Sequence, residues 1–187
     1  MLADAAEASQ TTPFRAPAGS GRFCELFEAY QPAMRRLVAA YVVNSADRDD
    51  LLQDIATGIW KSLPDFRGES SERTWIYRIA HNIAIRYAAG VRTRSAREPM
   101  LEDTFDHPSS DASTEAALLL DERRRILVQS IRELPPADRQ IVTLHLEGLS
   151  AAEIEEITEV SQGAVATRLT RIRQKLGECV QAGGRGQ

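Results

Sequence analysis

The sequence predicts an all-α protein of two small helical domains joined by a flexible acidic linker. Apolar residues recur three or four positions apart in several segments, and no segment shows the alternation that is typical of strands. An acidic stretch without periodicity separates the two periodic halves, and it cannot bury enough apolar area to offset its ordering entropy. We place a disordered tail at 1–20, a first domain at 21–95, the linker at 96–114, a second domain at 115–180 and a disordered tail at 181–187.

Three helices are expected in the first domain. The first carries an apolar stripe made of Phe23, Phe27, Tyr30, Met34, Leu37, Val38 and Tyr41. Pro32 is expected near a bend or a helix start. A second helix should run from Asp47 to Leu63, where Pro64 ends it, and a third should carry the inner stripe of Ile76, Ile79, Ile83 and Tyr87.

The second domain is expected to end in a helix, a short turn and a second helix. Helix begins again at Glu115, breaks at Pro135 and Pro136, continues from Ala137 to Leu146 and closes at Gly148. Ser150 and Glu153 predict a capping box at the start of the next helix. The last helix has an inward stripe of Val165, Leu169, Ile172 and Leu176. Its opposite face is small at the leading end and cationic further on, which is typical of a recognition helix in a major groove. A solvated basic surface is the alternative.

The net charge of −4 is unevenly divided along the chain. Residues 21–96 and 123–187 each carry +2, whereas residues 97–122 carry −7, so two weakly basic domains flank an acidic connector. No apolar run is long enough to insert into a membrane, and the N-terminus lacks the features of a secretory signal. Cys24 and Cys179 do not form a disulfide framework or a zinc site, which suits a cytoplasmic protein and leaves a redox role for either cysteine open.

The first domain should present two surfaces of opposite charge. Asp47, Asp49, Asp50 and Asp54 cluster over the first turns of one helix. They could stabilise the helix dipole, or they could form an acidic patch for a basic protein partner. The next segment interleaves arginines with Trp75, Tyr77, Asn82 and Tyr87, the residue types that bind single-stranded nucleic acid, although the aromatic rings could equally be core.

At these residues the chain resembles the extracytoplasmic-function sigma factors, the minimal promoter-specificity subunits of bacterial RNA polymerase. The matching segments are DRDDLLQDIATGIWKSLPDFRGE, SERTWIYRIAHNIA, ELPPADRQIVTLHLEGLSAAEIEEI and VSQGAVATRLTRIRQKL. The resemblance implies a sigma region 2 helical bundle and a region 4 helix-turn-helix. It also implies a non-catalytic protein that binds core polymerase, recognises promoter DNA and starts transcription.

The resemblance assigns three sets of residues. The surface that binds the clamp helices of the largest polymerase subunit corresponds to Asp47, Asp49, Asp50, Leu51, Gln53 and Asp54. The loop and helix that bind the melted minus-ten strand correspond to Arg67, Gly68, Ser70, Ser71, Arg73, Trp75, Tyr77, Arg78, Asn82 and Arg86. The helix that reads the minus-thirty-five duplex corresponds to Ser161, Gln162, Gly163, Ala164, Ala166, Thr167, Arg168, Thr170 and Arg171. The flap of the second polymerase subunit and an anti-sigma factor are further expected partners.

Three positions depart from the family pattern. Glu159 stands where the turn usually has glycine, which is unfavourable if the backbone there is left-handed. Ala166 and Thr170 stand where larger DNA-contacting side chains are common, which affects promoter preference rather than the fold.

Two other classes of function compete with this one. The alternative is a helix-turn-helix transcriptional regulator whose N-terminal domain is a sensor or dimerisation module, but such a protein needs neither the aspartates nor the basic aromatic helix. An enzyme is disfavoured because His81, His107 and His145 lack metal-ligand spacing and no phosphate-binding loop or nucleophile elbow is present. We therefore expect no cofactor and no metal.

Overall fold

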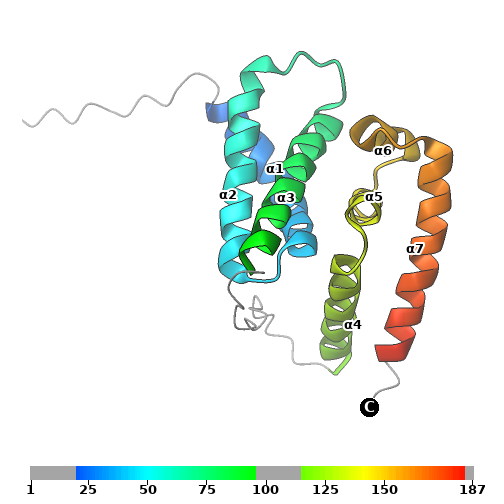
Figure 1. Ribbon diagram of the computed structural model, residues 1–187. Coiled ribbons are helices and arrows are strands. Elements are labelled where there is room, and N and C mark those ends of the chain that lie inside the picture. The colour runs from blue at the N-terminus through cyan, green and yellow to red at the C-terminus, as the bar shows by residue number, and fades with distance from the viewer. Residues whose placement is uncertain (1–19, 96–114, 184–187) are drawn as a thin grey trace, which may run out of the picture.

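The computed structural model describes residues 20–95 and 115–183, and every regular secondary-structure element in those two ranges is a helix (Figure 1). The first module contains α1 (Ser20–Tyr41), α2 (Ser45–Ser62), the short 3-10 helix η1 (Leu63–Asp65) and α3 (Glu72–Ser95). The second module contains α4 (Glu115–Arg132), α5 (Pro136–Leu146), α6 (Ala151–Thr158) and α7 (Gln162–Gly183). The all-α prediction is confirmed.

The predicted linker and the predicted N-terminal tail lie outside the described residues, apart from the last tail residue, Ser20, which begins α1. The C-terminal tail was predicted to begin at residue 181, and that boundary is wrong because α7 continues to Gly183. The periodic apolar stripe used for the prediction ends at Leu176, so it gave no information about the last two turns of the helix.

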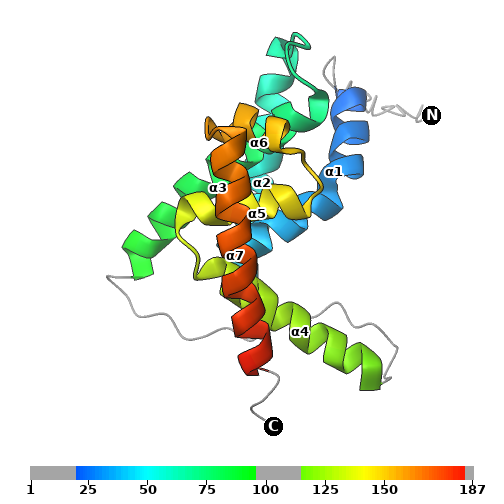
Figure 2. The ribbon, with the colours of Figure 1, turned by 90° about the vertical axis from the view of Figure 1, so that its right-hand side faces the viewer.

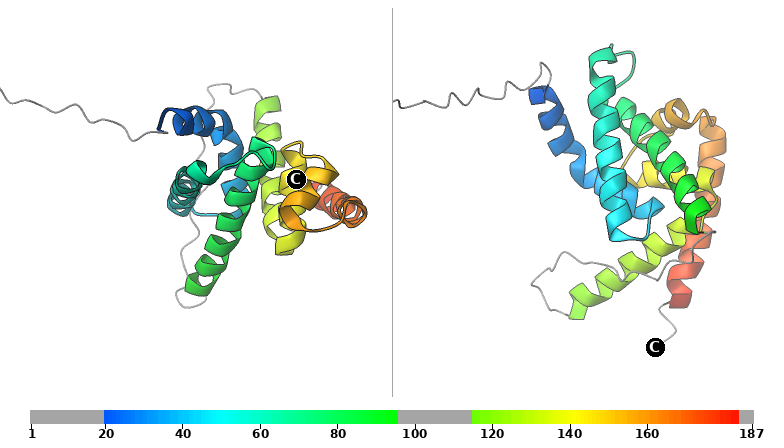
Figure 3. Two further views of the ribbon diagram at one scale, coloured as in Figure 1. Left: turned by 90° about the horizontal axis from the view of Figure 1, so that it is seen from above. Right: turned by 60° about the vertical axis from the view of Figure 1, so that its left-hand side comes forward.

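The boundaries of the first module have local causes. Asn44 caps α2, because its side-chain oxygen accepts hydrogen bonds from the backbone nitrogens of Ala46 (2.8 Å) and Asp47 (3.2 Å). Pro32 lies inside α1, and the helix changes direction along its length in Figure 3. A proline removes one helical hydrogen bond and favours such a bend.

The core of the first module lies between α1, α2 and α3. Met34, Leu37, Leu51, Ile55, Ile59 and Ile76 are its largest fully buried side chains. At Gly58, on α2, a Cβ atom would collide with the Ile83 side chain of α3. Glycine therefore permits these two helices to pack closely.

In the second module, α5, α6 and α4 all pack against α7. Each of the four residues in the predicted stripe of α7 is buried: Val165, Leu169, Ile172 and Leu176. Gly148 has a positive φ of 77° and ends the turn after α5, as the sequence predicted.

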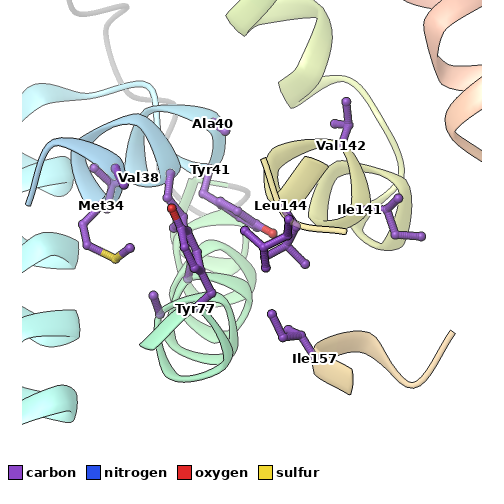
Figure 4. Close-up of a cluster of buried hydrophobic side chains, with 14 of the residues drawn as sticks. Met34, Val38, Ala40, Tyr41, Tyr77, Ile141, Val142, Leu144 and Ile157 are labelled. Carbon is purple, nitrogen blue, oxygen red and sulfur yellow. The ribbon is translucent and has the colours of Figure 1, made fainter. Parts of the chain in front are cut away.

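The two modules also pack against each other, which the sequence did not predict. α3 contacts α6, and α1 contacts α4 and α5 (Figure 2). Figure 4 shows Tyr41 and Tyr77 of the first module beside Leu144 and Ile157 of the second, and all four side chains are buried. Burial of these apolar groups joins the modules through one continuous core.

Candidate polymerase and nucleic-acid interfaces

The acidic patch consists of the exposed residues Asp49, Asp50 and Asp54, with Asp47 at its edge. Asp47 is half-buried, and its carboxylate accepts a hydrogen bond from the Tyr87 hydroxyl at 3.3 Å. Only Asp47 lies in the first turn of α2, where the helix dipole acts most strongly. The helix dipole therefore does not explain why the other three aspartates are present on the exposed face of α2.

Two further residues were assigned to this surface. Gln53 is exposed beside the patch. Leu51 has no exposed surface and belongs to the hydrophobic core, so its assignment as a contact residue is wrong for this conformation. A leucine within an acidic segment can match a family motif because it packs inward, and sequence alone does not separate the two roles.

The loop between η1 and α3 forms an open pocket of about 620 Å³. Phe66 and Trp75 contribute tilted aromatic rings whose centroids are 4.9 Å apart, and Arg67 and Ser70 also line the pocket. Gly68 has a φ of 74°, a backbone conformation that favours glycine. The carboxylates of Asp65, Glu69 and Glu156 line the pocket as well, so its walls are aromatic and of mixed charge. A pocket of this size can accept one planar polar group such as a base.

Ser71 has a structural role in this loop. Its hydroxyl oxygen accepts a hydrogen bond from the backbone nitrogen of Thr74 at 3.0 Å, which caps the start of α3. The hydroxyl also lies 2.7 Å from the Thr74 hydroxyl. Ser71 therefore supports the loop, and Ser70 is the serine that lines the pocket.

The single-strand face is defined as Arg73, Tyr77, Arg78, Asn82 and Arg86 of α3. Asn82 and Arg86 are exposed, whereas Tyr77 is 2% exposed. Burial, and secondarily the nearby Glu147 carboxylate, raise the pKa of Tyr77. One end of the face is thus open to solvent, and the other end is covered.

The residues that cover this face belong to the second module. Glu147 accepts a hydrogen bond from the Tyr77 hydroxyl at 3.2 Å, and its backbone oxygen accepts one from Arg73. Arg78 forms an ion pair with Glu156 of α6 at 2.8 Å. Glu147 and Glu156 were not among the predicted site residues, because nothing local in the sequence pairs them with α3.

The helix-turn-helix begins with the predicted capping box. The Ser150 side chain accepts from the backbone nitrogen of Glu153 (3.3 Å), and the Glu153 carboxylate accepts from the backbone nitrogen of Ser150 (2.8 Å). These hydrogen bonds lower the pKa of Glu153. Glu159 ends α6 in the left-handed region, with φ 60° and ψ 14°. The turn therefore has the unfavourable combination expected from the sequence, a non-glycine residue with a left-handed backbone.

The recognition face is defined as the exposed side of the segment from Ser161 to Arg171. Seven of the nine predicted residues are exposed: Ser161, Gln162, Gly163, Ala166, Thr167, Thr170 and Arg171. Ala164 and Arg168 are half-buried. The hydroxyls of Thr167 and Thr170 donate to backbone oxygens of their own helix, at 2.9 and 3.0 Å.

Asp138 of α5 holds both arginines of the recognition face. Its carboxylate is 2.9 Å from Arg168 and 3.4 Å from Arg171, and the residue is 7% exposed. A buried carboxylate that accepts from two guanidinium groups restricts their rotamers. Sequence analysis missed Asp138, and the only available signal was an acid in the first turn of a helix that precedes a basic one.

The residues described by the structure offer no group of three histidine, cysteine or acidic side chains that could hold a metal ion. His81 is fully buried beside Tyr41, and His145 lies 2.7 Å from Arg173. Among these same residues, none of the helices is both long enough and apolar enough to cross a membrane.

Two family models match this chain. Residues 26–94 match the Sigma-70 region 2 family model, and residues 124–176 match the Sigma-70 region 4 model. The ECF RNA polymerase sigma-E factor of Escherichia coli is 35% identical over 159 residues, which cover 81% of this chain and 83% of that protein. The sigma-E factor of Haemophilus influenzae is 32% identical over 163 residues, covering 83% and 86% respectively.

Two solved structures share the fold. The sigma factor RpoE in complex with the anti-sigma factor NepR from Bartonella quintana has a TM-score of 0.65 at 19% identity, covering 86% of this chain and 97% of that one. CnrH in complex with the cytosolic domain of CnrY has a TM-score of 0.62 at 22% identity, covering 88% and 91%.

The chain belongs to the ECF sigma factors of bacterial RNA polymerase. It is a non-catalytic subunit that binds core polymerase, recognises promoters and directs transcription initiation. The helix-turn-helix regulator considered as an alternative is set aside, because its N-terminal domain would not match region 2.

Proposed function

We propose that three surfaces of this sigma factor bind three different targets. The acidic patch of α2, with Gln53, binds the clamp helices of core polymerase. The pocket beside Trp75 and the single-strand face of α3 bind the melted minus-ten strand. The recognition face of α7 reads the minus-thirty-five duplex.

The observation that carries this proposal is the opposite charge of two surfaces on one module. Asp49, Asp50 and Asp54 are exposed on α2, whereas Arg67 and Arg86 are exposed around the aromatic pocket and along α3. Complementary charge steers an acidic patch to a basic protein partner and arginines to phosphates. A strand that runs along α3 would reach Trp75 for stacking and Asn82 for hydrogen bonding to a base edge.

The energy for opening the promoter would come from binding. Unstacking a base step costs a few kcal/mol, and base–aromatic stacking returns about 1–3 kcal/mol per base. The recognition face has short side chains at its leading end and arginines further along, so that α7 could approach base edges while Arg168 and Arg171 reach phosphates or guanines.

We also propose the flap of the second polymerase subunit and an anti-sigma factor as partners, and the cytoplasm as the location. The family resemblance supports the flap. The two structural neighbours described above were solved with NepR and with the cytosolic domain of CnrY, and this supports an anti-sigma partner. The two free cysteines are compatible with a reducing compartment.

One transcription assay with purified core polymerase tests the proposal through two variants. Asp49→Asn/Asp50→Asn/Asp54→Asn should lower core affinity, chiefly through a slower and less salt-dependent association. Asn82→Ala should spare core binding and the closed complex but impair the open complex, and a promoter with a pre-melted minus-ten bubble should restore much of the loss.

The matched control for the aspartates is Glu25→Gln/Glu28→Gln/Glu133→Gln, which removes the same charge from exposed acids outside the patch and outside the pocket. Unchanged core affinity of the aspartate variant at low salt would contradict the core-binding assignment. If Asn82→Ala loses the closed complex and the bubble restores nothing, the assignment of α3 to the melted strand is wrong.

A further inference from the structure

Asp138 lies on the inward face of α5, where this helix packs against α7. Ile141 and Val142, three and four positions further along α5, are buried on the same face. α7 crosses α5 in Figure 2, and the two helices are in contact. On α7 the two arginines of the recognition face directly precede the buried residues Leu169 and Ile172. Two packed helices therefore fix the position of the Asp138 carboxylate relative to the recognition face.

The two arginines that contact Asp138 are held unequally. Arg168 donates from Nη1 to the Oδ1 atom of Asp138 at 2.9 Å, and 37% of its side chain is exposed. Arg171 donates from Nη2 to the Oδ2 atom at 3.4 Å, which is longer than an ordinary hydrogen bond of this kind, and 70% of its side chain is exposed. Arg168 is thus the closer counter-ion, whereas Arg171 extends further into solvent.

The Asp138 carboxylate needs at least one cation beside it. A buried carboxylate is costly unless it is paired, and Arg168 forms the shorter and less exposed of the two ion pairs. The pair with Arg171 is more exposed, and exposed pairs contribute little to stability. Arg171 can therefore turn toward DNA at little cost while Arg168 remains beside the carboxylate.

A guanidinium whose direction is restricted is suited to reading a base edge. Arginine has five N–H donors in one plane, and the contact with Asp138 uses one of those on Arg171. In the major groove, the O6 and N7 atoms of guanine can accept two of the remaining donors. A guanidinium that rotates freely also reaches phosphates, and phosphate contacts carry no sequence information. The direction of Arg171 therefore affects how well it discriminates between bases.

We propose that Asp138 is a positioning residue for promoter recognition: it keeps Arg168 as its counter-ion and directs Arg171 toward one base pair of the minus-thirty-five element. This inference rests on the proposed function of the recognition face and deepens it, because it gives the two arginines different roles. Asp138 acts only through Arg171, since its own carboxylate is buried and repels phosphates. It also neutralises one positive charge of the face, which limits sequence-independent attraction to DNA.

The test measures closed-complex formation by polymerase assembled with this sigma factor, on a library of minus-thirty-five elements and at several salt concentrations. Asp138→Asn keeps the shape of the side chain but removes its charge. Discrimination at the base pair read by Arg171 should fall about fivefold, because the guanidinium is no longer directed. Affinity for DNA without a promoter should rise, and its salt dependence should steepen by about one phosphate contact. A side chain needed only for folding would instead lower the affinity for all sequences equally.

Two further substitutions show whether Asp138 acts through Arg171. Arg171→Ala identifies the base pair concerned, and in that background Asp138→Asn should cause no further loss of discrimination. Arg168→Gln leaves Arg171 as the only cation paired with the buried carboxylate, so Arg171 should turn inward and discrimination should fall at the same base pair. An Arg168 that only contacts a phosphate would give a uniform loss. Arg168→Gln thus tests the proposal even if Asp138→Asn does not fold.

The matched control is Glu178→Gln, which removes one negative charge from α7 outside the recognition face. Glu178 is exposed and accepts a hydrogen bond from Gln174. This control should leave both discrimination and salt dependence unchanged. Asp138→Glu keeps the charge and should retain more discrimination than Asp138→Asn. Urea denaturation of every variant separates a loss of folded protein from a change in recognition.

Two results would overturn the proposal: discrimination at the Arg171 base pair that the folded variants of Asp138 and Arg168 leave unchanged, or a loss that is equal at every position. Both are separable from a failure of the proposed function. If Arg171→Ala still alters the preference at one base pair, the recognition face reads the minus-thirty-five element and only the role of Asp138 is wrong. If no substitution on the face alters any preference, Arg171→Ala included, the proposed function fails as well.

Discussion

The two surfaces proposed to bind DNA differ in what covers them. The recognition face of α7 is exposed along most of its length, and its two arginines are held by Asp138 of the same module. At the single-strand face of α3, Tyr77 and Arg78 contact carboxylates of the other module. The surface proposed to read duplex DNA is thus complete within one module, whereas the surface proposed to bind the melted strand depends on how the two modules are arranged.

The difference has a physical reason. Duplex recognition needs short side chains on one helix face, and local packing positions them within a single helix-turn-helix. Single-strand capture needs aromatic rings and arginines, and both kinds of side chain also pack or pair within the chain. Here Trp75 packs against Phe66, and Arg78 pairs with Glu156.

The largest expected effect on the free energy of unfolding is at Tyr77, in the covered end of the single-strand face. Tyr77→Ala should lower the free energy of unfolding by about 3–5 kcal/mol, because it empties a buried aromatic site. Tyr77→Phe should cost only about 1 kcal/mol, since it removes one hydrogen bond to Glu147. Urea denaturation measures both, with Arg86→Ala, at the exposed end of the face, as a control that stays within about 0.5 kcal/mol. Equal losses for Tyr77→Ala and Arg86→Ala would show that the two ends do not differ.

The pH dependence of the free energy of unfolding should come from His81, another buried residue of α3. Burial lowers the pKa of His81 to about 3 from its ordinary value of 6.5, so the unfolded chain binds the extra proton between these values. The free energy of unfolding is therefore not lowered by His81 above pH 6.5. Between pH 6.5 and about 3 it falls by about 1.4 kcal/mol for each pH unit, because the unfolded chain binds a proton that the buried imidazole does not.

His81→Gln should therefore flatten the acid side of the stability curve relative to the parent protein. The measurement is urea denaturation at several pH values between about 4 and 7, within the range set by the two pKa values. His145→Gln is the control, because His145 is half-buried in the second module and hydrogen-bonds with Arg173. Parallel curves for the parent and His81→Gln would contradict the assignment.

A smaller effect is expected on the exposed recognition face. Arg171→Ala should leave stability almost unchanged but cost about 1–3 kcal/mol at one minus-thirty-five position if it contacts a base. Binding of the polymerase to a library of upstream elements measures this loss. Arg173→Ala, which removes an equal charge outside the face, serves as the control. A uniform loss over all sequences would identify Arg171 as a phosphate contact instead.

The smallest effect concerns the turn that joins α6 to α7. Glu159→Gly should stabilise the second module by about 0.5–1 kcal/mol, because glycine adopts the left-handed conformation without the cost that Glu159 incurs. Glu159→Gln removes the same charge but keeps the strained backbone, so it should give no such gain. Thermal unfolding compares the three proteins, and a glycine variant no more stable than the glutamine variant would show that the turn is not strained.

Much of the helical framework could be predicted because its causes are local. The apolar stripe of α7, the capping box of Ser150 and Glu153 and the turn at Gly148 all depend on residues a few positions apart. The candidate site was predicted less completely. Leu51 matched a surface motif but lies in the core, and Ser71 caps a helix. Asp138 was missed because its partners lie about thirty residues away in the sequence.

The sequence by itself determined the helices, the capping box of α6, the opposite charges of α2 and α3, and the family. Only the tertiary structure decided that the two modules share a core and that Glu147 meets Arg36, which lies 111 positions earlier. Periodicity and capping act over one or two turns, so residue spacing records them directly. A contact between distant helices depends on shape, burial and chain connectivity together, and no local pattern of residues records that combination.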